Sequence, residues 1–175
     1  MSLYIASLNS GSNGNCYYVG NKNEAILVDA GISCRTIERR LKQLGISIEK
    51  IKAVFISHEH TDHIKGVETL SKRFRLPVYI SHKTFVCSDL NVDPSFIRHF
   101  NHGDKISIGG IEVHAFSKIH DAGDPYSFCV SDGTIHVGVF TDIGTCCENV
   151  IGWFSKCHAA FLESNYDDAM LDEGP

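Results

Sequence analysis

The stretch Ile56-Ser57-His58-Glu59-His60-Thr61-Asp62-His63-Ile64-Lys65-Gly66 decides the fold of this 175-residue chain. It holds four potential metal ligands within six residues, directly after an apolar segment that is typical of a strand. Side chains alternate along a strand, so His58 and His60 lie on the same side of its end. A helix that begins near Asp62 can aim Asp62 and His63 back at the same region. The spacing therefore predicts that one pair of ligands holds one ion and the other pair a second.

The ligand types indicate which metals to expect. Imidazole and carboxylate suit zinc, manganese or iron, and neutral nitrogen ligands favour zinc. The competing interpretation is a solvated, histidine-rich loop between a strand and a helix, which a single His-x-His pair would favour. The full pattern His-x-His-x-Asp-His after an apolar strand favours the metal site instead.

The segments around this stretch predict a mixed sheet with intervening helices. Two-residue alternation and turn residues indicate strands, and the dipeptide Asp132-Gly133 predicts a hairpin. Apolar residues at helical spacing indicate two helices, at Cys34–Leu44 and from Asp62 or His63 to about Phe74. We therefore expect an α/β (α+β) layered sandwich that forms one domain over residues 1–175. The expected strands are Ser2–Leu8, Cys16–Val19, Ala25–Asp29, Ala53–Ser57, Val78–Ser81, Lys105–Ile108, Ile111–Phe116, Tyr126–Ser131, Thr134–Thr141 and Ala159–Glu163.

Composition excludes several classes of protein. The net charge of −5 argues against a strongly basic protein that coats nucleic acid. It does not exclude an enzyme whose metal ions hold phosphates, because the ions supply positive charge. Seven cysteines at irregular spacing predict reduced thiols. No apolar run reaches the ~18–20 residues of a transmembrane helix, and the first residues lack a secretory pattern, so we expect a cytoplasmic protein without membrane association.

The metal motif resembles the signature of metallo-β-lactamase-fold hydrolases, which implies an αββα sandwich. Three further residues match other motifs of that fold in the right order: Asp29, His120 and Asp142. The resemblance implies that Asp29 braces the metal-binding loops, that His120 is the third histidine of the first metal, and that Asp142 bridges both ions. Alone, Asp29 and Asp142 are equally typical of turns, and His120 is one histidine among ten. The implied ligands are His58, His60, His120 and Asp142 for the first ion, and Asp62, His63 and Asp142 for the second.

Two flanking segments narrow the resemblance to one branch. Residues 10–15, Ser-Gly-Ser-Asn-Gly-Asn, and 162–167, Leu-Glu-Ser-Asn-Tyr-Asp, resemble motifs of the YycJ-like (WalJ) branch. That branch often has histidine where Tyr166 stands. The match covers essentially the whole chain. It implies a cytoplasmic nuclease with DNA as its substrate and 5′-to-3′ exonuclease action.

The sequence departs from the fold in one respect. The fold normally ends with a fifth motif, a histidine that completes the second metal site. Neither His136, inside an expected strand, nor His158, before one, fits that position. We therefore expect a chain that lacks the C-terminal part of the fold, with a second site that binds its ion weakly.

The resemblance also suggests a mechanism. Two divalent ions would share a bridging water, lower its pKa and produce a hydroxide that attacks phosphorus. We expect Asp62 to act in catalysis with the second ion, and Glu163 either to orient a proton donor or to be a solvated strand end. Ser12, Asn13 and Asn15 offer hydroxyl, amide and backbone N–H groups to phosphate oxygens, unless their loop is only a hairpin turn.

Other functions remain open at this point. A glyoxalase-II-like thioesterase, or another small-molecule hydrolase, keeps the bridging aspartate and is the main alternative. Secreted lactamases typically have cysteine where Asp142 stands, and flavo-di-iron proteins commonly have glutamate where His60 stands, so both are disfavoured. A binding or scaffold module with structural metal is the non-catalytic alternative. The sequence leaves the oligomeric state open.

Overall fold

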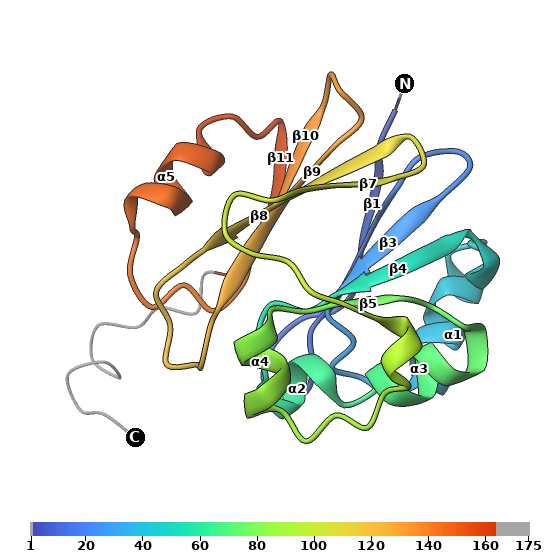
Figure 1. Ribbon diagram of the computed structural model, residues 1–175. Coiled ribbons are helices and arrows are strands. Elements are labelled where there is room, and N and C mark those ends of the chain that lie inside the picture. Colours follow the sequence, from blue (N-terminus) through green and yellow to red (C-terminus); the bar gives the residue numbers. More distant parts are fainter. Residues whose placement is uncertain (1, 164–175) are drawn as a thin grey trace.

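Two β-sheets lie face to face, and helices cover their outer faces, in the computed structural model (Figure 1). The structure describes residues 2–163, so residues 164–167 of the second branch motif, Tyr166 among them, lie outside the described residues. This arrangement confirms the predicted mixed sheets and the α/β sandwich.

The first sheet has six strands in sequential order. The first three pair antiparallel, and the last three continue the sheet in parallel. Parallel neighbours need crossover connections, and helices supply most of them. The strands are β1 (Tyr4–Asn9), β2 (Cys16–Gly20), β3 (Ala25–Val28), β4 (Ile51–Phe55), β5 (Val78–Tyr79) and β6 (Ile97–Arg98).

The second sheet has five strands in the order β11-β10-β9-β8-β7. All its pairs are antiparallel except β10 with β11. The hairpin predicted at Asp132-Gly133 joins β9 to β10 and is confirmed. The strands are β7 (Lys105–Ile108), β8 (Ile111–Ser117), β9 (Tyr126–Ser131), β10 (His136–Phe140) and β11 (Ala159–Leu162).

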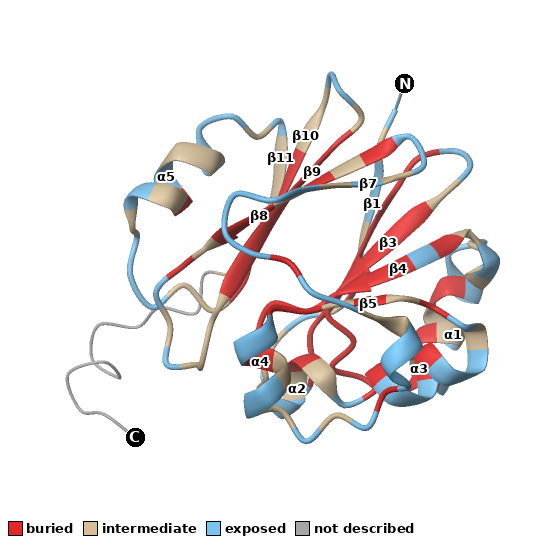
Figure 2. Cartoon of the chain, in the orientation of Figure 1, coloured by how far each residue is buried: buried red, intermediate tan, exposed pale blue. Residues whose placement is uncertain are grey.

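Strand alternation divides the apolar side chains among three layers of core, one between the sheets and one beneath the helices on each outer face. In β4, Ala53 and Phe55 point into the layer between the sheets, whereas Val54 points into the layer beneath the helices. Phe55 meets Phe128 of β9 across the sheet interface, edge to face, with ring centroids 5.6 Å apart. Burying each such ring contributes roughly 1.5–3 kcal/mol, so these contacts hold the sheets together. Figure 2 shows that buried residues concentrate on the strands, while the outer helices keep exposed faces.

The helices lie outside the sheets. Helices α1 to α4 cover the first sheet, and α5 covers the second (Figure 1). Every helix within residues 2–163 is too short or too polar to span a bilayer. The helices are α1 (Cys34–Gln43), α2 (Thr61–Ile64), α3 (Val67–Phe74), α4 (His82–Cys87) and α5 (Glu148–Phe154), with short 3₁₀ turns at Ile48–Lys50 and Pro94–Phe96.

The prediction of a single helix from Asp62 or His63 to about Phe74 was wrong. The structure divides it into α2 and α3 at Gly66. The Gly66 N–H donates to the carbonyl of Ala30, 2.7 Å away. A Cβ at Gly66 would lie 2.2 Å from the carbonyl oxygen of Ile32, so the chain passes too close for a side chain there. The close contact with residues 30–32 thus interrupts the helix at Gly66, although the apolar spacing of the sequence continues through it.

Candidate metal centre

The predicted metal motif lies at the carboxyl end of β4, where the strand passes into α2. His58 and His60 lie in the connection, and Asp62 and His63 lie in the four-residue helix. Two backbone hydrogen bonds fix this helix: Asn15 N–H donates to the Asp62 carbonyl at 2.6 Å, and Ala30 N–H donates to that of His63 at 2.8 Å. The loops after β1 and β3 therefore hold the motif from two sides.

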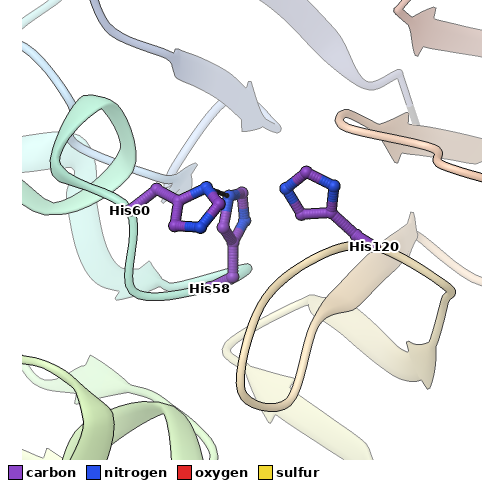
Figure 3. A group of neighbouring side chains, drawn as sticks. All are labelled: His58, His60 and His120. Atoms are coloured by element: carbon purple, nitrogen blue, oxygen red, sulfur yellow. Dashed lines mark hydrogen bonds between the residues drawn. The ribbon is translucent and has the colours of Figure 1, made fainter.

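The first cluster consists of three histidines from both halves of the chain (Figure 3). Nε2 of His58 lies 3.1 Å from Nδ1 of His60. His120 comes from the loop between β8 and β9, and its ring centroid is 4.8 Å from that of His58 and 5.2 Å from that of His60. The ligand atoms of all three lie within 4.8 Å of one another. The fold thus brings together the three histidines that the sequence assigned to the first ion.

The second cluster shares His58 and adds His63 and Asp142. Asp142 follows β10, and its Oδ2 lies 2.9 Å from Nε2 of His63 and 4.0 Å from Nε2 of His58. Asp142 has a φ of +48°, a left-handed conformation that aspartate tolerates better than most residues. One carboxylate oxygen therefore faces His63 and also His58, the histidine that the two clusters share.

Asp62 and Asn15 flank the second cluster. Oδ2 of Asp62 lies 3.5 Å from Nε2 of His63, and the Asp62 side chain is about one third exposed. Asn15 is buried, and its amide nitrogen donates to Asp62 Oδ2 at 3.3 Å and lies 3.0 Å from His63 Nε2. The side-chain oxygen of Asn15, Oδ1, accepts from the Gly11 N–H and from the Tyr17 hydroxyl. These contacts let Asn15 hold Asp62 and His63, and substrate binding by Asn15 stays a prediction.

Asp29 lies directly beneath the histidines and is completely buried. Its carboxylate accepts from the backbone N–H and the hydroxyl of Ser57, each at 2.8 Å, and contacts Nδ1 of His63 at 2.8 Å. The Ser57 oxygen in turn lies 2.9 Å from Nδ1 of His58. Both histidines therefore direct Nδ1 toward this support and leave Nε2 for the site. Such outer contacts fix the ring orientation of metal-binding histidines.

Burial and charge set the protonation of the histidines. Burial disfavours the charged form of His63, but Asp29 and Asp142 outweigh it and raise its pKa to about 10. Burial, followed by the charge of His63, lowers the pKa of His58 far below its usual range. Burial also lowers the pKa of His120. Neutral imidazole is the form that binds metal, so His58 and His120 are prepared for it.

Charged groups also surround Asp142. The ammonium group of Lys118 is buried and donates to the Thr141 carbonyl. Burial lowers the Lys118 pKa to about 8, although the charges of Asp142, Asp29 and Glu163 oppose this shift. Glu163 accepts from the Asp142 N–H, and burial together with the Asp142 charge raises the Glu163 pKa.

The donor set fits a divalent transition metal. Nε2 of His120 is buried and has no hydrogen-bond partner within residues 2–163, while Nδ1 of His120 contacts Asp121 at 2.9 Å. A buried polar atom without a partner costs free energy, and a metal ion beside His58 and His60 would satisfy it. Three imidazoles with nearby carboxylates are ligands that zinc, manganese and iron accept.

The remaining predicted residues lie at the edge of the site or beside it. Ser12 and Asn13 are exposed on the loop after β1, and substrate binding by them stays a prediction. The Glu163 carboxylate accepts from the backbone N–H of Asp142, and Glu163 belongs to neither cluster of the described residues. The sequence interpretation missed Ser57 and Lys118. Only their positions, next to His58 and two residues before His120, could have indicated them.

Comparisons with known proteins agree with this geometry. Residues 10–88 match the model of the metallo-beta-lactamase superfamily. The fold resembles YhfI from Bacillus subtilis, a metallo-beta-lactamase fold protein, with a TM-score of 0.64 and 18% identity over 78% of this chain and 62% of that one. A metallo-beta-lactamase from Cronobacter sakazakii gives a TM-score of 0.65 and 18% identity, over 89% of this chain and 75% of that one.

Curated relatives are more similar in sequence. The chain is 35% identical to the exodeoxyribonuclease YycJ of Bacillus anthracis, over 99% of this chain and 67% of the relative. It is 31% identical to the exodeoxyribonuclease WalJ of Streptococcus pneumoniae, over 95% of this chain and 64% of the relative. The chain thus spans about two thirds of the length of these relatives. It belongs to the metallo-β-lactamase superfamily of metal-dependent hydrolases, in the branch that contains YycJ and WalJ.

Proposed function

We propose that this protein is a phosphodiester hydrolase that degrades DNA as a 5′-to-3′ exonuclease with two divalent ions, preferably zinc. One observation carries the two-ion proposal: a single oxygen of Asp142 lies 2.9 Å from Nε2 of His63 and 4.0 Å from Nε2 of His58. A carboxylate beside the imidazole that the two clusters share is suited to bridging two metals. The exodeoxyribonuclease names of the YycJ and WalJ relatives support DNA as the substrate.

We propose that the ligands divide as the family resemblance implies. We assign His58, His60, His120 and Asp142 to the first ion, and Asp62, His63 and Asp142 to the second. Bound divalent ions would lower the pKa of water toward about 7 and neutralise phosphate oxygens. This assignment gives the second ion one protein ligand fewer than the first, so we propose that it binds more weakly.

The chain's own residues prepare this chemistry. Asp29 and Ser57 hold the rings of His58 and His63 so that Nε2 of each faces the site. Glu163 supports the Asp142 backbone, and its raised pKa lets its carboxyl hold a proton at higher pH than an exposed glutamate. We propose that this carboxyl orients the proton donor for the leaving oxygen. The exposed Ser12 and Asn13 would contact the phosphate backbone.

Metal-dependent cleavage of end-labelled DNA tests the proposal. Chelated protein is reloaded with zinc or manganese and given single- and double-stranded DNA labelled at either end, with a glutathione thioester in parallel. We expect metal-dependent release of nucleotides from the 5′ end. His120→Ala should abolish it, whereas His82→Ala, which removes an exposed histidine outside both clusters, should not. Cleavage of the thioester without DNA degradation would instead support the thioesterase.

A further inference from the structure

Glu59 is the one residue between the two histidines of the His-x-His pair, and it contacts the other half of the site. Its Oε1 accepts from the backbone N–H of Gly123 at 2.6 Å. Gly123 lies in the loop between β8 and β9, three residues after His120. Glu59 therefore joins the segment that carries two ligands of the first cluster to the loop that carries the third.

The two segments approach closely where Glu59 lies. A Cβ at Gly123 would lie 3.0 Å from Oε1 of Glu59 and 2.9 Å from Sγ of Cys87, so the loop is packed against both. One other hydrogen bond from this region to the motif segment is Tyr126 N–H to the Ser57 carbonyl, at 2.9 Å. That bond lies at the start of β9. The Thr84 hydroxyl also holds the loop, through the Asp124 carbonyl at 3.0 Å, but Glu59 provides the hydrogen bond between the loop near His120 and the motif segment itself.

The environment of Glu59 indicates that its carboxylate is held for this contact. Its Oε2 is buried and has no hydrogen-bond partner in the described part of the chain. Burying a carboxylate oxygen without a partner costs free energy, which the hydrogen bond from Gly123 offsets only in part. An apolar or shorter residue at this position would avoid this cost but would lose the hydrogen bond to Gly123. The hydrogen bond to the loop is therefore the feature that a carboxylate adds here.

We propose that Glu59 is a positioning residue that holds the His120 loop against the His58–His60 segment and thereby sets the spacing of the three nitrogens of the first metal site. The proposal rests on the metal site proposed above, but not on the substrate. Glu59 itself belongs to neither ligand cluster among residues 2–163. Loss of the contact should free the loop and move His120 away from the other two ligands.

Zinc affinity is the direct test, because it does not depend on DNA cleavage. Glu59→Ala should weaken zinc binding roughly 10- to 100-fold in competition with a chromophoric chelator, the range found for outer-shell residues. Glu59→Gln keeps an oxygen for Gly123 N–H and should restore most of the affinity. The cobalt(II)-loaded protein should show a changed visible spectrum in Glu59→Ala and a nearly unchanged one in Glu59→Gln.

Glu68→Ala is the matched control. Oε1 of Glu68 also accepts a backbone N–H, that of Asn91 at 2.8 Å, but outside the metal clusters. Equal zinc loss in Glu59→Ala and Glu68→Ala, or wild-type affinity in Glu59→Ala, would overturn the proposal. If Glu59→Ala does not fold, Gly123→Ala crowds the same contact from the other side and should weaken zinc binding; unchanged affinity there would also overturn it. Absence of DNA cleavage with zinc binding as expected would reject the nuclease function alone.

Discussion

Nδ1 of His63 lies 2.8 Å from Oδ2 of Asp29, and both side chains are completely buried. Asp29 reaches this position through a φ of +60° at the end of β3. The same carboxylate accepts two hydrogen bonds from Ser57, which in turn contacts His58. One buried carboxylate thus orients a histidine of each proposed metal site.

Asp29→Asn should weaken both the fold and the metal site. Asparagine keeps one oxygen and gains an NH2 group, so it cannot accept all three contacts, from the Ser57 N–H, the Ser57 hydroxyl and His63, that the two carboxylate oxygens make. We expect a loss of about 1–3 kcal/mol in the free energy of unfolding and a roughly 10- to 100-fold loss of zinc affinity. Urea unfolding and zinc competition measure these effects. Asp93→Asn, at an exposed 3₁₀ cap, is the control and should change neither; equal behaviour of the two variants would contradict the role of Asp29.

The raised pKa of His63 predicts how the stability of the metal-free protein depends on pH. Its pKa of about 10 in the folded protein exceeds its ordinary value of 6.5, so the folded state keeps a proton that the unfolded chain releases. The resulting stabilisation is complete below about pH 6.5 and is lost as the pH rises toward 10.

Urea unfolding of the chelated protein between pH 6 and pH 10 checks this dependence. The free energy of unfolding of the wild type relative to His63→Asn should decrease steadily across that range. Lys118, with a pKa near 8, titrates in the same range in both proteins, so the comparison isolates His63. A difference that does not vary with pH would show that His63 has no raised pKa.

Local sequence patterns were sufficient for most strands and for the first half of the site. The alternation of Ala53, Val54 and Phe55 defines β4, and the two-residue spacing of His58 and His60 just after it predicted that their rings lie together. These features depend on neighbours in the sequence. That is why a layered sandwich of mixed sheets and the motif at the end of β4 could be predicted from local patterns, whereas the αββα arrangement followed from the family resemblance.

Features that depend on distant segments could not be predicted from local patterns. The apolar spacing of Ile64, Val67 and Leu70 continues across Gly66, and only the hydrogen bond to Ala30 reveals the break. The short strand β6 and helix α5 have too few residues to show a period. Lys118 is buried because the segment after β8 packs against the segment after β10, where the Lys118 ammonium donates to the carbonyl of Thr141, and these segments are far apart in the sequence.

Two substitutions of Asp142 should separate the effect of its charge on zinc binding from the effect of its backbone conformation on stability. Asparagine tolerates the left-handed φ of +48° almost as well as aspartate, whereas alanine costs roughly 1–2 kcal/mol there. Asp142→Asn should therefore fold normally but lose zinc, the second ion first, because it lacks the bridging charge. Asp142→Ala should lose zinc and also unfold at lower urea concentration. Metal analysis after dialysis that finds two ions in Asp142→Asn would contradict the bridging role.

Gly31→Ala should damage the site without removing any ligand. A Cβ at Gly31 would lie 1.6 Å from the carbonyl oxygen of Asp62 and 2.7 Å from the backbone nitrogen of Asn15. The loop carrying Asp62 must therefore shift, and overpacking of this kind typically costs about 1–3 kcal/mol. We expect lower stability together with weaker zinc binding, since the ligands of the second ion move with the loop.

Gly152→Ala is the matched glycine substitution. Apart from its chain neighbours and the backbone of its own helix, no atom of the described residues lies within 4 Å of its added Cβ, and the residue lies in α5, away from the metal clusters. Alanine is favoured over glycine inside a helix by up to about 1 kcal/mol, so this variant should be slightly more stable and bind zinc normally. Opposite changes in the two variants would show that the close approach of Gly31 to Asp62, rather than the loss of a glycine, maintains the metal centre. Normal zinc binding in Gly31→Ala would mean that the loop relaxes without moving the ligands.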